Sequence, residues 1–407
     1  MPFKETCVAD EKLRFIVEYL KGERTMTGLC ERFGISREWG YELVRRYGAD
    51  GPSGLEPRSR APHRPGRVMP EAMASAVMEL RQGRPSWGPK KLRAVLVRRE
   101  PQMAWPAPST IGELLRREGL SQPRRRRRTP LPLTRPFEPV RAPNDLWCID
   151  FKGWFRTGDG QRCDPLTLTD ADSRLLIDCR IVEPTMEGVQ PVVEAALREH
   201  GLPAAIRSDN GSPFAGNGAA GLTRLAVHWI KLGIRLERTD PAAPQQNGRH
   251  ERMHGTLKAE TARPPADTAG EQQARFDRFR ADFNHNRPHE ALGQETPASH
   301  FRPSPRPYPQ RIDEPAYAPD QAVRRVRSNG EIKWGGDLIF VSEALIGEPV
   351  GVAETETGDW IVRFAEVPLG IIDRRTRKLR PFAPARPGRR TLHRKQTGKT
   401  VNHVSGP

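Results

Sequence analysis

The sequence has 407 residues, with 67 Lys and Arg against 50 Asp and Glu, so its net charge is +17 at pH 7. This length exceeds that of one ordinary domain and predicts two to four domains. The cationic surplus indicates a polyanionic partner, and nucleic acid is the commonest one. A merely solubilising surface is the alternative, and it is less favoured because the basic residues are clustered.

The five cysteines form no CxxC pair, and their number is odd. This pattern argues against a disulfide framework and a cysteine-based zinc site, and it suits a reducing compartment. The N-terminal segment lacks the apolar core of a signal peptide, and no apolar run approaches membrane-spanning length. We therefore expect a cytoplasmic, nucleoid-associated protein of bacterial type without a membrane partner.

Residues 1–50 are predicted to form a helix-turn-helix domain of three short helices. The first helix carries Leu13, Ile16, Val17 and Leu20 at helical spacing. Thr27 is expected to cap the second helix, Gly34 supplies a turn, and Ser36 is expected to cap the third. The third helix would enter the major groove, and its candidate DNA contacts are Arg37, Tyr41, Arg45 and Arg46. A plain three-helix packing unit remains the alternative.

A Pro-, Gly- and Arg-rich linker is predicted at 51–68, followed by a second helix-turn-helix-like domain at 69–122. Its last helix, for which Ser109 or Thr110 is the expected cap, carries two candidate DNA contacts, Arg116 and Arg117. Residues 123–142 are predicted to be an Arg- and Pro-rich linker. It contains a run of five candidate phosphate contacts, Arg124, Arg125, Arg126, Arg127 and Arg128. This run is either a solvated linker or an arm that follows the DNA backbone.

Residues 143–302 are predicted to form an α/β core with a mixed sheet and helices on its faces, because strands come first and then alternate with helices. The expected strands are 146–151, 165–169, 175–182, 204–207 and 234–237, and the expected helices are 188–200, 221–232 and 248–262. A Pro-rich linker at 303–320 then leads to a small β-barrel at 321–375. The basic tail at 376–407 is expected to be disordered.

Three carboxylates of the predicted core stand where they can converge. Asp150 and Asp209 lie at the ends of predicted strands, and Glu251 lies one turn into a predicted helix. Carboxylates about 4 Å apart repel by about 4 kcal/mol at an effective dielectric near 20, so such a cluster requires cations. Oxygen ligands favour Mg²⁺ or Mn²⁺, and two such ions suit phosphodiester displacement. The alternative is three ordinary acids, since a lone Asp at a strand end is usually a turn former.

The strings WCIDFKG, IRSDNGSPF, PQQNGRHERMHGTLKAE and NHNRPHEALGQETPASHF resemble the DDE core shared by insertion-sequence transposases and retroviral integrases, which has a ribonuclease-H-like fold. The resemblance implies that Asp150, Asp209 and Glu251 are the catalytic, metal-binding triad. Asp150 and Asp209 are separated by 58 residues, as the family pattern expects. The 41 residues between Asp209 and Glu251 exceed the usual spacing of about 35, and the surplus is assigned to a Gly-rich loop at 214–221.

The resemblance further implies a Mg²⁺- or Mn²⁺-dependent transposase, with two ions at each site, that cleaves element ends at terminal inverted repeats and joins them to target DNA as a homo-oligomer. A catalytically idle DNA-binding regulator and a ribonuclease H are the alternatives. His254 and Lys258 share a helical face with Glu251 and are expected to approach DNA phosphates. Zinc binding by His250 with His254, or by His285 with His289, is disfavoured because no cysteine is near.

Overall fold

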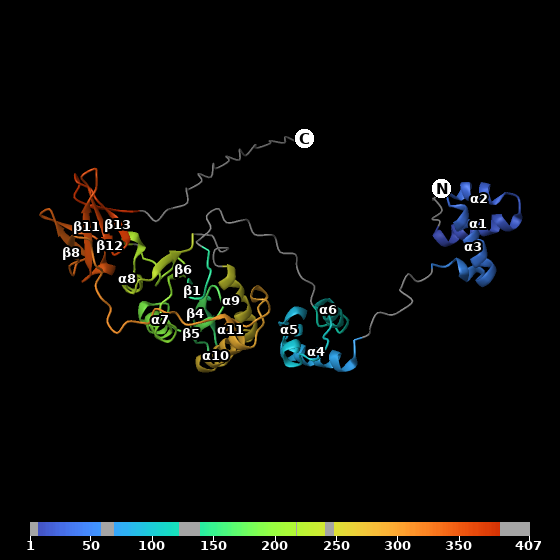
Figure 1. The fold of residues 1–407 in the computed structure, drawn as a ribbon, viewed down its shortest axis with the longest axis horizontal. Helices are drawn as coiled ribbons and strands as arrows, with labels where there is room; N and C mark the ends of the chain where they lie inside the picture. Colours follow the sequence, from blue (N-terminus) through green and yellow to red (C-terminus); the bar gives the residue numbers. More distant parts are fainter. Residues whose placement is uncertain (1–6, 58–68, 122–138, 217, 241–247, 383–407) are drawn as a thin grey trace, which may run out of the picture. The chain divides into compact units, whose positions relative to one another are not determined.

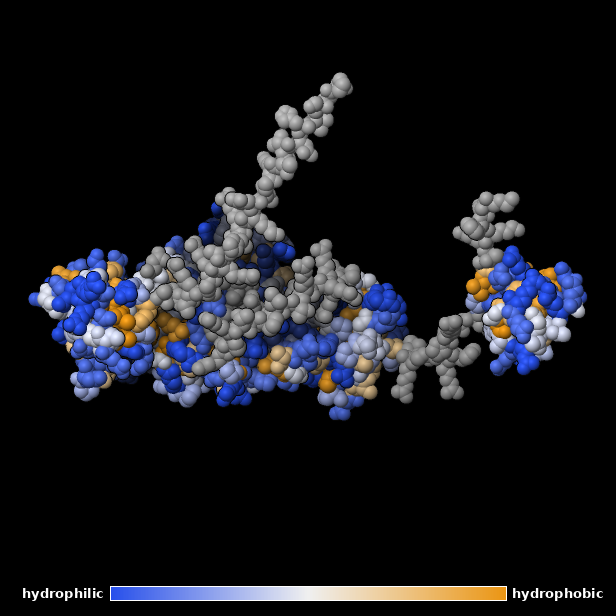
Figure 2. Space-filling model, turned by 90° about the horizontal axis from the view of Figure 1, so that it is seen from above, coloured by the Kyte–Doolittle hydropathy of each residue, from blue (hydrophilic) through white to orange (hydrophobic). Residues whose placement is uncertain are grey.

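The computed structural model describes residues 7–57, 69–121, 139–216, 218–240 and 248–382 (Figure 1). The chain divides into two compact units, Met1–Pro70 and Glu71–Pro407, and each is considered by itself. Within the described residues, none of the helices has the length and apolar character needed to cross a membrane. The face seen in Figure 2 is mainly hydrophilic, and its apolar residues form small separate patches.

The first unit contains α1 (Val8–Lys21), α2 (Met26–Phe33), α3 (Arg37–Asp50) and a short 3₁₀ helix, η1 (Gly51–Leu55). Ser36 caps α3 as predicted, with its hydroxyl accepting from Trp39 N at 3.2 Å. The predicted cap of α2 is wrong, because Thr25 accepts from Gly28 N and Thr27 lies inside the helix. Gly34 ends α2 in the left-handed conformation, with φ at 64°.

The core of this unit consists of Phe15, Ile16, Leu29, Cys30, Leu43 and Leu55. Ile16 is buried as expected, but Leu13, Val17 and Leu20 are exposed. The buried face of α1 is therefore not the one that the apolar spacing predicted. Leu55 lies in the range predicted to be linker. Its burial extends the helical unit to η1, beyond the expected boundary at residue 50.

The second unit begins with three helices, α4 (Glu71–Gly83), α5 (Pro89–Arg99) and α6 (Pro108–Arg117). They pack on one another through buried Val77, Trp87, Leu92, Ile111 and Leu115. The expected cap of α6 is wrong, since Ser109 and Thr110 lie inside the helix and Ala107 precedes it. Polar pairs that join these helices to the rest of the unit include Ser86–Glu260, Arg84–Asp282 and Lys90–Glu290.

A five-stranded mixed sheet forms the centre of the second unit, in the order β5-β4-β1-β6-β7. Its strands are β1 (Trp147–Phe151), β4 (Pro165–Asp170), β5 (Leu176–Ile181), β6 (Ala205–Ser208) and β7 (Arg235–Arg238). β1 and β4 pair antiparallel, as do β4 and β5, whereas β1 with β6 and β6 with β7 pair parallel. The mixed sheet predicted from the sequence is confirmed.

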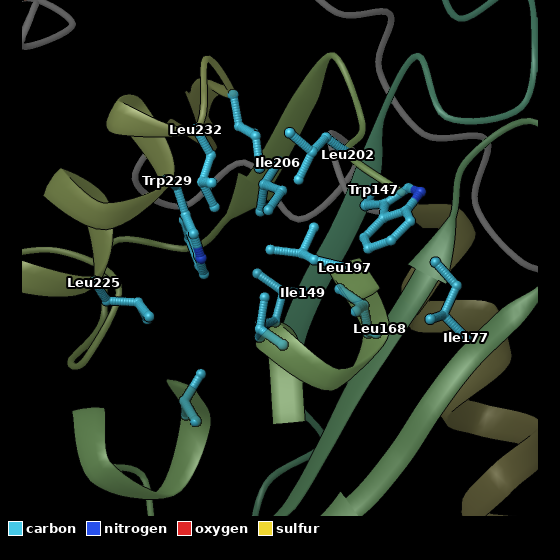
Figure 3. Close-up of a cluster of buried hydrophobic side chains, with 14 of the residues drawn as sticks. Trp147, Ile149, Leu168, Ile177, Leu197, Leu202, Ile206, Leu225, Trp229 and Leu232 are labelled. Atoms are coloured by element: carbon cyan, nitrogen blue, oxygen red, sulfur yellow. The ribbon is translucent and has the colours of Figure 1, made fainter. Parts of the chain in front are cut away.

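Strand periodicity divides this core between the two faces of the sheet. Side chains such as Trp147, Ile149, Leu168 and Ile177 pack against α7 (Met186–His200) and α8 (Arg224–Lys231), as Figure 3 shows. The alternate positions, such as Leu176 and Cys179, pack against α9 (Gly248–Thr261) and α10 (Ala269–His285). Because side chains alternate along a strand, Asp150 faces the α9 side while Ile149 faces α7.

Smaller elements complete the core. β2 (Phe155–Arg156) and β3 (Arg162–Cys163) form a hairpin directly after β1. A 3₁₀ turn, η2 (Ala219–Gly221), precedes α8, while η4 (Glu290–Leu292) and α11 (Pro297–His300) follow α10. The Pro-rich segment predicted at 303–320 has no helix or strand, yet it is held against the core. Leu202 N donates to Arg306 O at 2.7 Å, and the Tyr308 hydroxyl donates to Glu194 at 3.0 Å.

The C-terminal part of the described chain is all β. One sheet has the order β14-β13-β12-β11-β8 and contains β8 (Ala322–Arg325), β11 (Pro349–Glu354), β12 (Trp360–Phe364), β13 (Val367–Ile372) and β14 (Leu379–Pro381). A second sheet pairs β9 (Glu331–Trp334) with β10 (Asp337–Phe340), and a 3₁₀ turn, η5 (Glu343–Leu345), follows β10.

The all-β character of this module was expected, but its two sheets are not closed into the predicted barrel. β14 lies inside the range predicted as a disordered tail, so the module extends past residue 375. Residues 383–407 of that tail lie outside the described chain. The module packs on the core through apolar residues that include Ala226 and Val227 of α8, and Lys231 pairs with Glu348 at 2.8 Å.

Candidate active site

Asp150 occupies the fourth position of β1, and its side chain is 22% exposed on the α9 side of the sheet. It lies opposite Thr167 in the antiparallel ladder with β4. The Thr167 hydroxyl donates to the carbonyl oxygen of Asp150 at 3.1 Å, which fixes the backbone that carries the carboxylate.

Asp209 is brought beside Asp150 by the parallel ladder between β1 and β6. Cys148 pairs with Arg207, so two further positions along both strands place Asp209 level with Asp150. Neighbouring strands lie about 4.8 Å apart. The Asp209 carboxylate accepts from Gly211 N at 3.0 Å, and Asn210 donates to Thr239 O at 2.5 Å. These bonds tie the turn after β6 to the end of β7.

Glu251 lies exposed in the first turn of α9. The charges of the other two acids act on Asp150: burial first, then the negative charges of Asp209 and Glu251, raise the pKa of Asp150 to about 7. A like charge nearby disfavours the ionised form of a carboxyl group. The charges of Asp209 and Glu251 thus reach Asp150, so the three sequence-predicted carboxylates act on one another electrostatically.

Two buried histidines of α9, His250 and His254, lie beneath Asp150. The Nε2 atoms of His250 and His254 lie 2.7 and 2.6 Å from the Thr167 hydroxyl, and Nδ1 of His250 lies 2.8 Å from the Thr169 hydroxyl. Because the Thr167 hydroxyl donates to Asp150, it accepts from both Nε2–H groups. Burial lowers the pKa of His250 to about 3 and that of His254 to about 2, so both imidazoles are neutral.

This burial corrects the expectation that His254 approaches DNA phosphates. Its Nδ1 atom instead faces Asp150, 3.9 Å from the carboxylate. Ligand atoms of Asp150, His250 and His254 lie within 4.8 Å of one another, a group that could hold a metal ion. Both nitrogens of His250 are occupied by threonine hydroxyls, so only Nδ1 of His254 offers a nitrogen lone pair. The oxygen donors of Asp150, Asp209 and Glu251 fit Mg²⁺ or Mn²⁺ better than this mixed group does.

The other predicted DNA contacts fall into three classes. Arg46 is only 7% exposed and donates to Glu56 O at 2.9 Å, so its assignment as a DNA contact is corrected to a structural role. The other helical residues that were predicted to contact DNA are all exposed: Arg37, Tyr41, Arg45, Arg116, Arg117 and Lys258. Three of these form ion pairs on their own helix or beside its end, Arg45 with Glu42, Arg116 with Glu113 and Arg117 with Glu118. The run from Arg124 to Arg128 lies outside the described residues.

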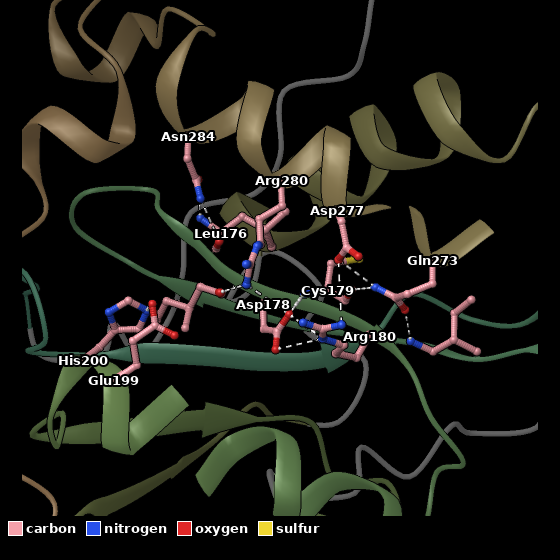
Figure 4. Close-up of polar contacts among 12 residues, drawn as sticks. Leu176, Asp178, Cys179, Arg180, Glu199, His200, Gln273, Asp277, Arg280 and Asn284 are labelled. Atoms are coloured by element: carbon pink, nitrogen blue, oxygen red, sulfur yellow. Dashed lines mark hydrogen bonds and ion pairs between the residues drawn. The ribbon is translucent and has the colours of Figure 1, made fainter. Parts of the chain in front are cut away.

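Two other acids near the sheet have structural partners. Asp170 is buried and accepts from Asn144 N and from the backbone and hydroxyl of Ser173. Asp178 pairs with Arg180 and Arg280, each at 3.2 Å, as Figure 4 shows. Both carboxylates are therefore occupied in holding the sheet to its neighbouring segments.

Thr167 and Thr169 were not expected to be part of this site. A signal for them was present, since they alternate with Leu166 and Leu168 along β4. Because this alternation has period two, both threonines lie on the face opposite the leucines, which is the face of Asp150.

Known families match the chain in four places. The integrase core domain matches residues 140–244 and again 232–297, a helix-turn-helix domain matches 11–63, and a homeodomain-like domain matches 39–115. The matches to the integrase core include all three carboxylates. They define the class of the protein as one with an integrase-type core and helix-turn-helix domains.

The insertion element IS407 uncharacterized 31.7 kDa protein of Burkholderia multivorans is 30% identical over 233 residues, which are 56% of this chain and 80% of that protein. The chain therefore belongs to the insertion-sequence transposases with an integrase-type core.

Solved structures match more distantly. The magnesium-bound catalytic core of HTLV-2 integrase has a TM-score of 0.31 at 16% identity, over 40% of this chain and 98% of that one. The catalytic core of BIV integrase has a TM-score of 0.30 at 20% identity, and the match covers 39% of this chain and 93% of that one. A simian T-cell lymphotropic virus intasome has a TM-score of 0.34 at 16% identity, and the match covers 76% of this chain and 99% of that one. The family assignment does not depend on these low scores.

Proposed function

We propose that the chain is an active DDE transposase that cleaves DNA at the ends of an insertion sequence and joins the 3′ ends to target DNA. The observation that carries this proposal is the parallel register of β1 and β6, which sets Asp209 beside Asp150 on the face that α9 covers. Glu251, in the first turn of α9, would complete the set. Binding to terminal inverted repeats and assembly as a homo-oligomer on DNA remain predictions.

The three carboxylates would hold Mg²⁺ or Mn²⁺, two ions in each site, and these ions would supply charge neutralisation for an in-line phosphodiester displacement. The protein's own contribution is positioning. The neighbouring strand β4 holds the backbone of Asp150 through the Thr167 hydroxyl. Hydrogen bonds of Gly211 and Asn210 fix the turn that carries Asp209. Lys258 is exposed seven residues after Glu251 on the same helix, where it would bind a DNA phosphate.

The test is cleavage and strand joining on DNA that carries the element's own ends, with Asp150→Asn, Asp209→Asn and Glu251→Gln compared with wild type. Each change removes a ligand charge and keeps the side chain's shape, so we expect rates to fall by about three powers of ten or more while end binding survives. Glu271→Gln is the matched control, because Glu271 is also an acid in the first turn of an exposed helix end. Near-normal joining by any of the three variants would remove that residue from the site.

Wild-type protein that binds element ends but neither cleaves nor joins them with Mg²⁺ or Mn²⁺ would support the idle DNA-binding regulator instead.

A further inference from the structure

The hairpin directly after β1 displays a tryptophan close to the carboxylate site. Trp154 is 58% exposed, although tryptophan side chains are highly buried on average. The hairpin around it is anchored, because the Phe155 ring packs edge-on against Phe276 with centroids 6.4 Å apart, and Cys163 is fully buried. Lys152 N also donates to Pro165 O at 2.9 Å. The exposed indole therefore stands on a fixed base.

Two arginines of the same hairpin lie against the Trp154 ring. The guanidinium carbons of Arg162 and Arg156 are 5.2 and 5.9 Å from the ring, within cation–π range. Each arginine is held in turn. Arg162 donates to both carboxylate oxygens of Asp164 at 2.7 and 2.8 Å, and Arg156 donates to Gly160 O at 2.6 Å. The ring thus sits among positioned cations rather than in an apolar patch.

Further cations continue from the hairpin toward the catalytic helix. Lys152 directly follows β1, Lys258 is exposed on α9, and Arg263 is exposed two residues after α9 ends. We call Lys152, Lys258 and Arg263 the cationic rim. Trp154 follows Asp150 by four residues, so its Cα lies within about 14 Å of that of Asp150. At 3.4 Å per base, this reach covers about four nucleotides.

We propose that Trp154 stacks on an unpaired base of the DNA end, next to the phosphate that the carboxylate site attacks, and that Arg156, Arg162 and the cationic rim contact the flanking phosphates. The inference rests on the proposed transposase function and deepens it. An aromatic face among cations suits a single strand, since any base can stack on it while the cations follow the backbone. Trp154 is accordingly a positioning residue that holds the DNA end open.

Trp154→Ala is tested on two DNA ends, one fully paired and one with mismatched terminal pairs. Loss of one stacked base predicts a fall in cleavage rate of about tenfold or more on the paired end. We expect the mismatched end to restore most of that rate, because its bases need no opening. Trp154→Phe, which keeps an aromatic face, should retain most activity on both ends. The unfolding temperature should be unchanged, since the side chain is exposed.

A second readout does not depend on cleavage. Glu251→Gln protein is bound to ends that carry 2-aminopurine at the terminal positions, with and without Trp154→Ala. Binding should change the 2-aminopurine fluorescence when Trp154 is present, and the change should be lost with Ala. Equal losses of cleavage on paired and mismatched ends, or a fluorescence change that survives Trp154→Ala, would overturn the proposal. Wild-type protein that opens the end but never cleaves would contradict the transposase function and leave this inference intact.

Discussion

Lys152 follows Asp150 by two residues and Lys258 follows Glu251 by seven, yet the carboxylate site and the cationic rim carry opposite charge. Burial and the charges of Asp209 and Glu251 raise the pKa of Asp150, and burial keeps His250 and His254 neutral, so the imidazoles do not compensate the negative charge. On the cationic rim, burial and the charges of Lys258 and Arg263 lower the pKa of Lys152. Under the proposed function, metal ions would bind the acids and DNA phosphates would bind the rim. Substitutions should therefore separate metal-dependent from DNA-dependent behaviour.

The largest stability effect is expected on the acidic side, for Asp150→Asn in metal-free buffer. The pKa of Asp150 rises from 3.8 to about 7 on folding, so the folded state binds the proton more tightly than the unfolded state. This stabilising contribution is complete below pH 3.8 and is lost as pH rises to about 7. By pH 8 the wild type should have lost up to about 4 kcal/mol that the Asn variant keeps.

Denaturant unfolding at pH 4 and pH 8 measures this effect. The unfolding free energy of the variant should exceed that of wild type at pH 8 and differ little from it at pH 4. Mg²⁺ should reduce the difference at pH 8, because it binds and stabilises the wild type. Asp313→Asn is the control, because that carboxylate is highly exposed. If the difference in unfolding free energy between wild type and Asp150→Asn stays constant with pH, the pKa of Asp150 is not raised on folding.

A smaller effect is expected on the cationic side, for Lys258→Gln. If Lys258 contacts one phosphate, its loss should flatten the slope of log affinity against log salt by about 0.9 and weaken binding to all duplex sequences alike. Lys231→Gln is the matched control, because the Lys231 ammonium is already paired with Glu348 at 2.8 Å. Salt titrations on end DNA and random DNA make the measurement, and an unchanged slope would remove Lys258 from the rim's phosphate contacts.

Much of the core could be predicted from the sequence, because its strands are short apolar runs and its helices have clear periodicity. All five strands of the central sheet were expected, and each lies within two residues of its predicted ends. Helix α10 was not expected, although it spans 17 residues. Its core positions, Phe276, Phe279 and Phe283, are separated by charged residues, so the segment reads as polar overall.

Residues whose roles depend on tertiary contacts were harder to predict. His254 and Lys258 are both spaced from Glu251 for one helical face, but spacing alone does not show which edge of that face a neighbouring strand covers. β4 covers His254 and leaves Lys258 exposed. Arg46 was assigned to DNA because it lies on the predicted recognition helix, yet it donates to the carbonyl of Glu56 beyond the end of that helix. Such long-range partners leave no periodic signal in the sequence.

Mn²⁺ binding, measured by calorimetry without DNA, tests the central claim most directly. The account predicts that wild type and Glu271→Gln bind Mn²⁺ alike, and that Asp209→Asn and Glu251→Gln each lower the affinity by about tenfold or more. His254→Asn tests the alternative metal site, which consists of Asp150, His250 and His254. Affinity that survives Asp209→Asn and Glu251→Gln but is lost with His254→Asn would contradict the account, because the ion would then lie between Asp150 and the buried histidines.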